Sequence, residues 1–153
     1  MIQLFFDGSC RPRNPGGHAR GGAIILYGDT IKKISKCVGT GDGMSCNVAE
    51  YAALNNALEW LIYKKLNDSK IEIFGDSLLV IRQMNHFIES DFKSDPRFSG
   101  LYSPYAKSCL SLIEKFTDIS FNWIPREQNE DADALSRCHI EFVREPRRAG
   151  LSV

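Results

Sequence analysis

Two aspartates each follow a short apolar run, where a solvated protein surface would not require an acidic residue. Asp7 closes the apolar run 4–6, and Asp76 follows the β-prone run 71–75. We expect both at the carboxyl ends of strands, where the ligand sites of open α/β sheets gather. The two carboxylates could therefore face one another.

Glu50 lies in line with the apolar stripe of a predicted helix over residues 47–66. It precedes Leu54 by four residues and Leu58 by eight, so all three share one helix face. A carboxylate on a buried face is costly unless it is paired, hydrogen-bonded or bound to metal. Glu59 falls outside the stripe, and we expect it to face solvent.

Asp133 lies near the start of a predicted last helix over residues 130–138. The helix dipole favours an acid in the first turn, and Asp131 suits that role about as well. Taken singly, the other acids also have structural explanations, because a strand-end aspartate often forms a turn or begins a helix. Spacing alone leaves these alternatives open.

Several carboxylates without a cysteine or histidine cluster suit a hard, oxygen-preferring ion such as Mg²⁺ or Mn²⁺. Two such ions about 4 Å apart form the clamp used for in-line phosphoryl displacement. One ion would orient and deprotonate the attacking water, and the other would stabilise the leaving 3′ oxygen. Without metal, repulsion between the carboxylates would raise some of their pKa values.

The apolar pattern predicts an α/β protein with a mixed sheet covered by helices. Gly28 and Asp29 would join two strands as an antiparallel hairpin, and residues 14–17, 39–43 and 86–100 are expected to be irregular. Strands are predicted at 2–6, 22–27, 30–38, 70–74 and 119–124, and helices at 47–66, 78–84, 104–116 and 130–138.

The composition is that of one globular domain. Of the 153 residues, 43% are hydrophobic and 25% charged, and 19 basic residues balance 19 acidic ones. This balance argues against binding nucleic acid by bulk positive charge alone, but it allows a few placed phosphate contacts. We expect a domain over residues 1–140 and a basic tail over residues 141–153.

The five cysteines are odd in number and include no CxxC pair, which excludes the common zinc and thioredoxin-like patterns. Free thiols favour a reducing compartment. The first residues lack the features of a signal peptide, and no apolar run is long enough to span a bilayer. We therefore expect a cytoplasmic protein with no membrane partner, and a monomer.

Taken together, four segments resemble the type 1 ribonuclease H family, with a match from about residue 2 to residue 138. The segments are 6–10 with 14–17, 47–54, 75–77 with Val80, and 129–135. They occur in the family's order and at its spacing, whereas any one alone would be a weak signal. The resemblance implies a ribonuclease H-like fold, with a five-stranded mixed sheet flanked by helices and a two-metal site at its centre.

The same resemblance implies an endonuclease that hydrolyses the RNA strand of RNA–DNA hybrids and leaves 5′-phosphate and 3′-hydroxyl ends. Double-stranded RNA is a second candidate substrate. Two Mg²⁺ ions would be the cofactors, and Mn²⁺ could replace them. By position in the motifs, the catalytic metal ligands would be Asp7, Glu50, Asp76 and Asp133.

Five further positions fall where family members contact the minor groove of the hybrid, and there the 2′-hydroxyl distinguishes RNA from DNA. They are Gly8, Ser9, Cys10, Asn14 and Asn47. For Asn14, a loop built from turn-forming residues is an equally good explanation.

Three departures from the family pattern bear on activity. The histidine that many bacterial members carry before the last motif is absent from residues 124–128, as in a shorter variant of the family, and Arg126, Glu127 or the tail could replace it. The basic protrusion of well-studied bacterial members is also missing, so we expect weaker, more salt-dependent binding. Leu78 replaces a common glutamine, so one groove contact would be lost.

Three other functions remain open from the sequence. The nearest is a catalytically weak nucleic-acid-binding module of the same fold, although binding alone would not require four buried carboxylates. A 3′–5′ exonuclease usually carries Asp-x-Glu in its first strand, whereas Asp7 is followed by Gly8 and Ser9. A sugar-kinase-like ATPase could begin with Asp-Gly-Ser, but the chain offers no second phosphate-binding loop and is too short for two lobes.

Overall fold

A mixed sheet with the strand order β3-β2-β1-β4-β5 forms the centre of the computed structural model, which describes residues 1–90 and 98–137. β1 is antiparallel to β2, and β2 to β3, whereas β4 is parallel to both β1 and β5. This arrangement confirms the predicted fold class. The strands are β1 (Ile2–Arg11), β2 (His18–Tyr27), β3 (Thr30–Thr40), β4 (Lys70–Gly75) and β5 (Asp118–Trp123).

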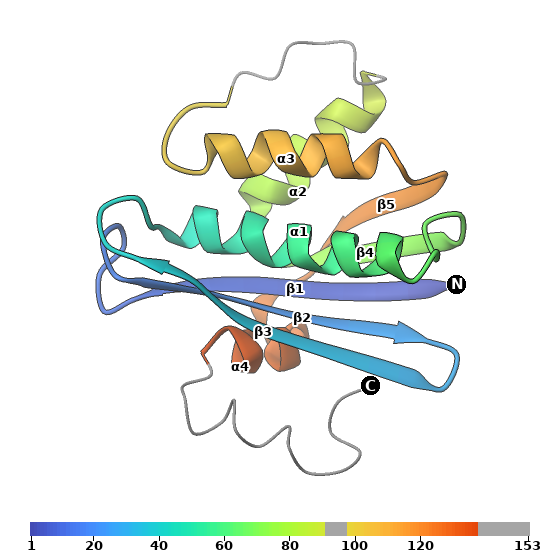
Figure 1. The fold of residues 1–153 in the computed structure, drawn as a ribbon, viewed down its shortest axis with the longest axis horizontal. Coiled ribbons are helices and arrows are strands. Elements are labelled where there is room, and N and C mark those ends of the chain that lie inside the picture. Colours follow the sequence, from blue (N-terminus) through green and yellow to red (C-terminus); the bar gives the residue numbers. More distant parts are fainter. Residues whose placement is uncertain (91–97, 138–153) are drawn as a thin grey trace.

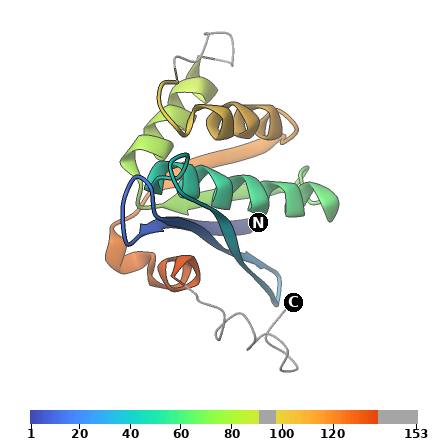
Figure 2. The same cartoon turned by 60° about the vertical axis from the view of Figure 1, so that its left-hand side comes forward.

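Three helices lie on one side of the sheet, and a fourth, short helix lies on the other (Figure 1). The turned view in Figure 2 shows the same layers, with α4 beneath β1 and β2. Among the described residues, none of the helices combines the length and apolar character needed to span a bilayer. The helices are α1 (Cys46–Tyr63), α2 (Leu78–Glu89), α3 (Ser103–Ile113) and α4 (Glu130–Ser136).

The apolar stripe of α1 packs on the sheet as predicted. Leu54 and Leu58 are fully buried in one core cluster with Leu4 of β1 and Ile73 of β4. Glu59 is exposed, in agreement with its position off the stripe. The first turns of α1 are therefore held against the centre of the sheet, which fixes where Glu50 can lie.

β1 is longer than predicted, and this corrects the expected position of Asp7. The aspartate is not at the end of the strand, because β1 continues to Arg11 and pairs Asp7 with Gly22 of β2. The pairing of β1 with β4, in contrast, stops at Phe5. On the β4 side Asp7 therefore lies just beyond the last parallel pair, and Asp76 follows the end of β4 as expected.

The glycine after Asp7 looks like a strand breaker in the sequence, yet it lies inside β1 because α1 approaches the strand there. A Cβ atom at Gly8 would overlap the backbone of Ala49 and Glu50 and would lie 2.8 Å from the Ala49 Cβ. Here glycine marks a close contact between strand and helix.

The C-terminal ends of α2 and α4 also differ from the predicted ones. α2 continues to Glu89, past the predicted end at residue 84, because Phe87 packs into the main core. α4 ends at Ser136 within the described residues. The predicted basic tail (141–153) lies outside those residues.

Replacing Gly8 with alanine should destabilise the fold, because the added methyl group has no room between β1 and α1. We expect a loss of about 3 kcal/mol in the free energy of unfolding. Urea or thermal unfolding would measure it. Gly43→Ala is the matched control, since a Cβ atom there meets no other atom within 4 Å; equal stability of the two variants would contradict the packing argument.

Candidate active site

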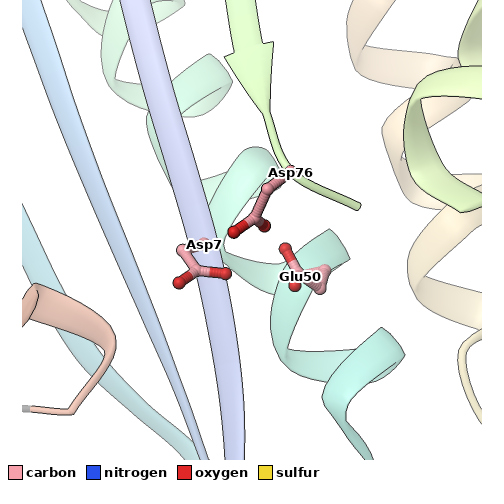
Figure 3. A group of neighbouring side chains, drawn as sticks. All are labelled: Asp7, Glu50 and Asp76. Atoms are coloured by element: carbon pink, nitrogen blue, oxygen red, sulfur yellow. The ribbon is translucent and has the colours of Figure 1, made fainter. Parts of the chain in front are cut away.

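Three carboxylates from separate elements converge at the end of β4. Asp7 comes from β1, Glu50 from α1 and Asp76 from the residue after β4, and their side chains point toward one another (Figure 3). One oxygen of each lies within 4.8 Å of the others. The structure thus brings together three of the four predicted ligands.

Glu50 is placed by the start of α1 and by the loop that precedes it. Ser45 caps the helix by accepting a hydrogen bond from the Val48 N–H at 3.1 Å. The side-chain oxygen of Asn14 accepts one from the Cys46 N–H at 2.9 Å, which ties the loop after β1 to the first turn of α1. As a result Glu50 is only 7% exposed.

Asp76 is placed by hydrogen bonds on both sides of its peptide. The Gly75 carbonyl accepts from the Ile124 N–H at 3.0 Å, and the Asp76 carbonyl accepts from the Trp123 indole at 3.2 Å. On the other side, Ser77 caps α2 by accepting from the Val80 N–H at 3.3 Å. The carboxylate of Asp76 therefore extends from a turn that is fixed at both ends.

Burial, together with the charge of a neighbouring acid, raises the pKa values of all three acids. Burial, a hydrogen bond with Asp133 and the charge of Asp76 raise the pKa of Asp7 from its ordinary value of 3.8 to about 7. Burial and the charges of Asp7 and Asp76 hold the pKa of Glu50 well above its usual range, and burial also raises that of Asp76. Bound cations would relieve this repulsion.

The donor set fits divalent metal ions. The Oε2 atom of Glu50 is buried without a hydrogen-bond partner in the structure. A buried carboxylate oxygen without a partner is costly, and a metal ion would supply one. Oxygen ligands from three carboxylates suit Mg²⁺ or Mn²⁺.

Asp133, the fourth predicted ligand, lies beside this group but does not belong to it. It is hydrogen-bonded to Asp7 and lines the same cavity. Its Oδ1 atom accepts from Arg137 Nε at 3.0 Å and lies 3.9 Å from Arg126 Nη2. α4 is anchored nearby, because the Asn129 side chain donates to the Phe6 carbonyl at 2.9 Å. Asp133 is thus linked to the other three acids by its contact with Asp7.

The predicted groove contacts divide into two sets. Gly8, Ser9 and Cys10 line the carboxylate cavity, which has a volume of about 460 Å³. Asn14 and Asn47 are not among its lining residues. Since the Asn14 oxygen accepts a hydrogen bond from the first residue of α1, Asn14 has the structural role that was the alternative to a groove contact.

The side chains of Ser9 and Cys10 are already engaged within the protein. Ser9 Oγ donates to the Ser136 carbonyl at 2.6 Å, and the Cys10 thiol donates to the Arg13 carbonyl at 3.0 Å. A substrate contact at these two positions would therefore fall to the backbone.

Four cavity residues were not identified as site residues from the sequence. Arg11, Cys46, Trp123 and Arg137 all line the cavity with the acids. Trp123 ends β5, and only the structure shows that β5 is the parallel neighbour of β4. Arg137 follows Asp133 by one helical turn, a spacing at which opposite charges pair.

Comparison with known proteins shows what this chain is similar to. A family model described as reverse transcriptase-like matches residues 5–139. The chain is 33% identical over 143 residues to ribonuclease HI of Halobacterium salinarum, covering 88% of this chain but only 62% of that protein. It is 26% identical over 141 residues to the protein EbsB of Enterococcus faecalis, covering 92% of this chain and 95% of EbsB.

A solved structure shares the fold over nearly the whole chain. LC11-RNase H1, isolated from compost, superposes with a TM-score of 0.70 at 31% identity, covering 96% of this chain and 98% of that one. The same protein in complex with an RNA/DNA hybrid gives a TM-score of 0.65 at 29% identity, covering 97% of this chain and 100% of that one.

Metal-free protein should lose stability as the pH rises from 3.8 to about 7, the ordinary and folded pKa values of Asp7. Between these two pH values the unfolded state has released a proton that the folded state retains. The free energy of unfolding is therefore higher below this pH range than above it. Mg²⁺ or Mn²⁺ should therefore raise the melting temperature by ~5 °C or more near pH 8 and by little near pH 5.

Thermal unfolding with EDTA and with metal, at both pH values, tests this expectation. Asp7→Asn should flatten the pH dependence of the metal-free protein. A metal-free protein that becomes more stable toward pH 8 would show that the repulsion has been misjudged.

Proposed function

Since the chain belongs to the type 1 ribonuclease H family, we propose that it hydrolyses the RNA strand of RNA–DNA hybrids at the site formed by Asp7, Glu50, Asp76 and Asp133. The observation that carries the proposal is the approach of three carboxylates within 4.8 Å, with one buried oxygen of Glu50 left without a partner. A binding module would gain nothing from this repulsion. A metal-dependent hydrolase, in contrast, requires such converging carboxylates to hold its cations.

Each acid has a distinct position in the proposed reaction. Asp7 lies between the other acids, close to Glu50 and Asp76 and hydrogen-bonded to Asp133. Asp7, with Glu50 and Asp76 on one side and Asp133 on the other, would hold the cations. Two divalent cations bound there would supply the positive charge that stabilises the attacking and leaving oxygens of an in-line displacement.

Residues near the start of α1 and in β1 would contact the substrate. Beyond Phe5 the β4-facing edge of β1 has no strand partner within the described part of the chain. The Gly8 N–H donates to Asp7 Oδ1 at 2.9 Å, so a contact with the minor groove would fall to the other backbone groups of residues 8–10. The side-chain donors of Ser9 and Cys10 point inward. We therefore assign recognition of the RNA 2′-hydroxyl to backbone atoms of residues 8–10, with Asn47 at the start of α1 as a further contact.

The hybrid is the favoured substrate because a relative of 29% identity, LC11-RNase H1, has been solved with an RNA/DNA hybrid. In-line displacement at the two cations would leave products with 5′-phosphate and 3′-hydroxyl ends. The four described cysteines, Cys10, Cys37, Cys46 and Cys109, are free thiols, which suits a reducing compartment such as the cytoplasm.

Cleavage of an end-labelled RNA–DNA hybrid with Mg²⁺ or Mn²⁺ tests the proposal directly. Cutting should be confined to the RNA strand, and Asp7→Asn and Glu50→Gln should each lower kcat by about 100-fold or more, because each removes a cation ligand. RNA duplex, DNA duplex and single-stranded RNA serve as comparison substrates, and RNA-duplex cutting would widen the substrate class.

Glu59→Gln is the matched control, because Glu59 lies on the same helix as Glu50 but is exposed. Its activity should equal that of the wild type. Binding of the hybrid without metal-dependent cleavage would overturn the enzyme proposal and favour a nucleic-acid-binding module.

A further inference from the structure

Trp123 lies at the edge of the carboxylate site without being one of its acids. It is the last residue of β5 and pairs with Gly75, the last residue of β4. Its indole N–H donates to the Asp76 carbonyl at 3.2 Å. The side chain is 48% exposed and lines the same cavity as Asp7, Glu50 and Asp76.

The end of β5 holds the turn from which Asp76 extends. Two consecutive carbonyls, those of Gly75 and Asp76, accept hydrogen bonds from the Ile124 N–H and from the Trp123 indole. Gly75 packs closely on the core, since a Cβ atom there would lie 2.6 Å from the Phe6 ring, whereas Asp76 after it is only half-buried. The direction of the Asp76 carboxylate therefore depends on these hydrogen bonds.

Packing does not explain a tryptophan at this position. Nearly half of its side chain faces water, so it contributes only part of the burial energy of a core tryptophan. Its polar atom, in contrast, meets the backbone of a predicted metal ligand. Residues that hold a ligand in place can be as important to a metal site as the ligands themselves.

We propose that Trp123 is a positioning residue, whose indole N–H fixes the Asp76 peptide so that the carboxylate stays close to Asp7 and Glu50 against their repulsion. The inference rests on the proposed metal site. It assigns Trp123 no contact with the reacting atoms. Loss of the hydrogen bond should weaken metal binding more than it slows the reaction once metal is saturating.

Trp123→Phe tests the inference, since it keeps an aromatic ring and removes the donor. We expect the Mg²⁺ concentration for half-maximal cleavage to rise about tenfold, the size of one lost hydrogen bond. At saturating Mg²⁺, kcat and the KM for the hybrid should stay within about twofold of the wild type, because the lost bond does not contact substrate. A lower kcat with unchanged Mg²⁺ dependence would overturn the positioning role.

Metal binding can also be read without substrate. Calorimetric titration with Mn²⁺ should show an affinity about tenfold lower for Trp123→Phe than for the wild type. Trp60→Phe is the matched control, because Trp60 packs on Tyr27 and is not among the residues that line the carboxylate cavity. Equal Mn²⁺ affinity for the wild type and Trp123→Phe would overturn the inference.

A spectroscopic measurement keeps the test valid even if Trp123→Phe folds poorly. The chain has two tryptophans, so Trp60→Phe leaves Trp123 as the single indole. Its fluorescence should change on addition of Mg²⁺, and Asp76→Asn should abolish the change. A single-tryptophan protein that binds Mn²⁺ by calorimetry but shows no Mg²⁺-dependent fluorescence would also overturn the inference.

These outcomes separate the inference from the proposed function. Wild-type protein that binds Mn²⁺ but does not cut the hybrid would remove the function and leave the role of Trp123 to be decided by the binding data. Wild-type protein that cuts the hybrid with the same Mg²⁺ dependence as Trp123→Phe would remove the role of Trp123 and leave the function intact.

Discussion

Carboxylates that converge in a partly buried site repel one another, and the rest of the fold has to supply the energy that holds them there. Asp7, Glu50 and Asp76 meet within 4.8 Å. Burial raises the pKa values of all three, and the charge of Asp76 raises those of Asp7 and Glu50 further. Each acid comes from a different element, so no local rearrangement can separate them. Bound cations would offset this electrostatic cost.

The elements that resist this repulsion are closely packed. α1 approaches β1 so closely that Gly8 has no room for a side chain, and the apolar stripe beyond Glu50 is fully buried. Asp76 is held differently, by hydrogen bonds from the end of β5 to the turn after β4. Core packing therefore fixes two of the acids, while backbone hydrogen bonds fix the third.

Sequence patterns predict what depends on burial and periodicity, and they miss what depends on close approach. The buried position of Glu50 was correctly predicted, because its helical stripe is continuous with the core. Asp7 was predicted at a strand end for a reason that proved wrong, since the glycine after it reads as a break but permits contact with α1. Asp133 and Asp131 could not be separated in the sequence, because only the folded chain shows that Asp131 is exposed and Asp133 meets Asp7. Trp123 was missed because its role depends on β5 lying beside β4.

The charges around the cavity explain how a chain with no net charge can still bind nucleic acid. Arg11, Arg126 and Arg137 line the cavity with the acids, and the last two already interact with Asp133. Without cations, the four acids outnumber these arginines once all are ionised, and they then repel phosphate. Bound cations would reverse the local sign and free the arginines from Asp133 for the substrate backbone. Bound metal would then favour binding of the hybrid, and bound hybrid would favour binding of metal by the same free energy, so the two should bind cooperatively. A large basic surface that attracts nucleic acid over long distances is then unnecessary.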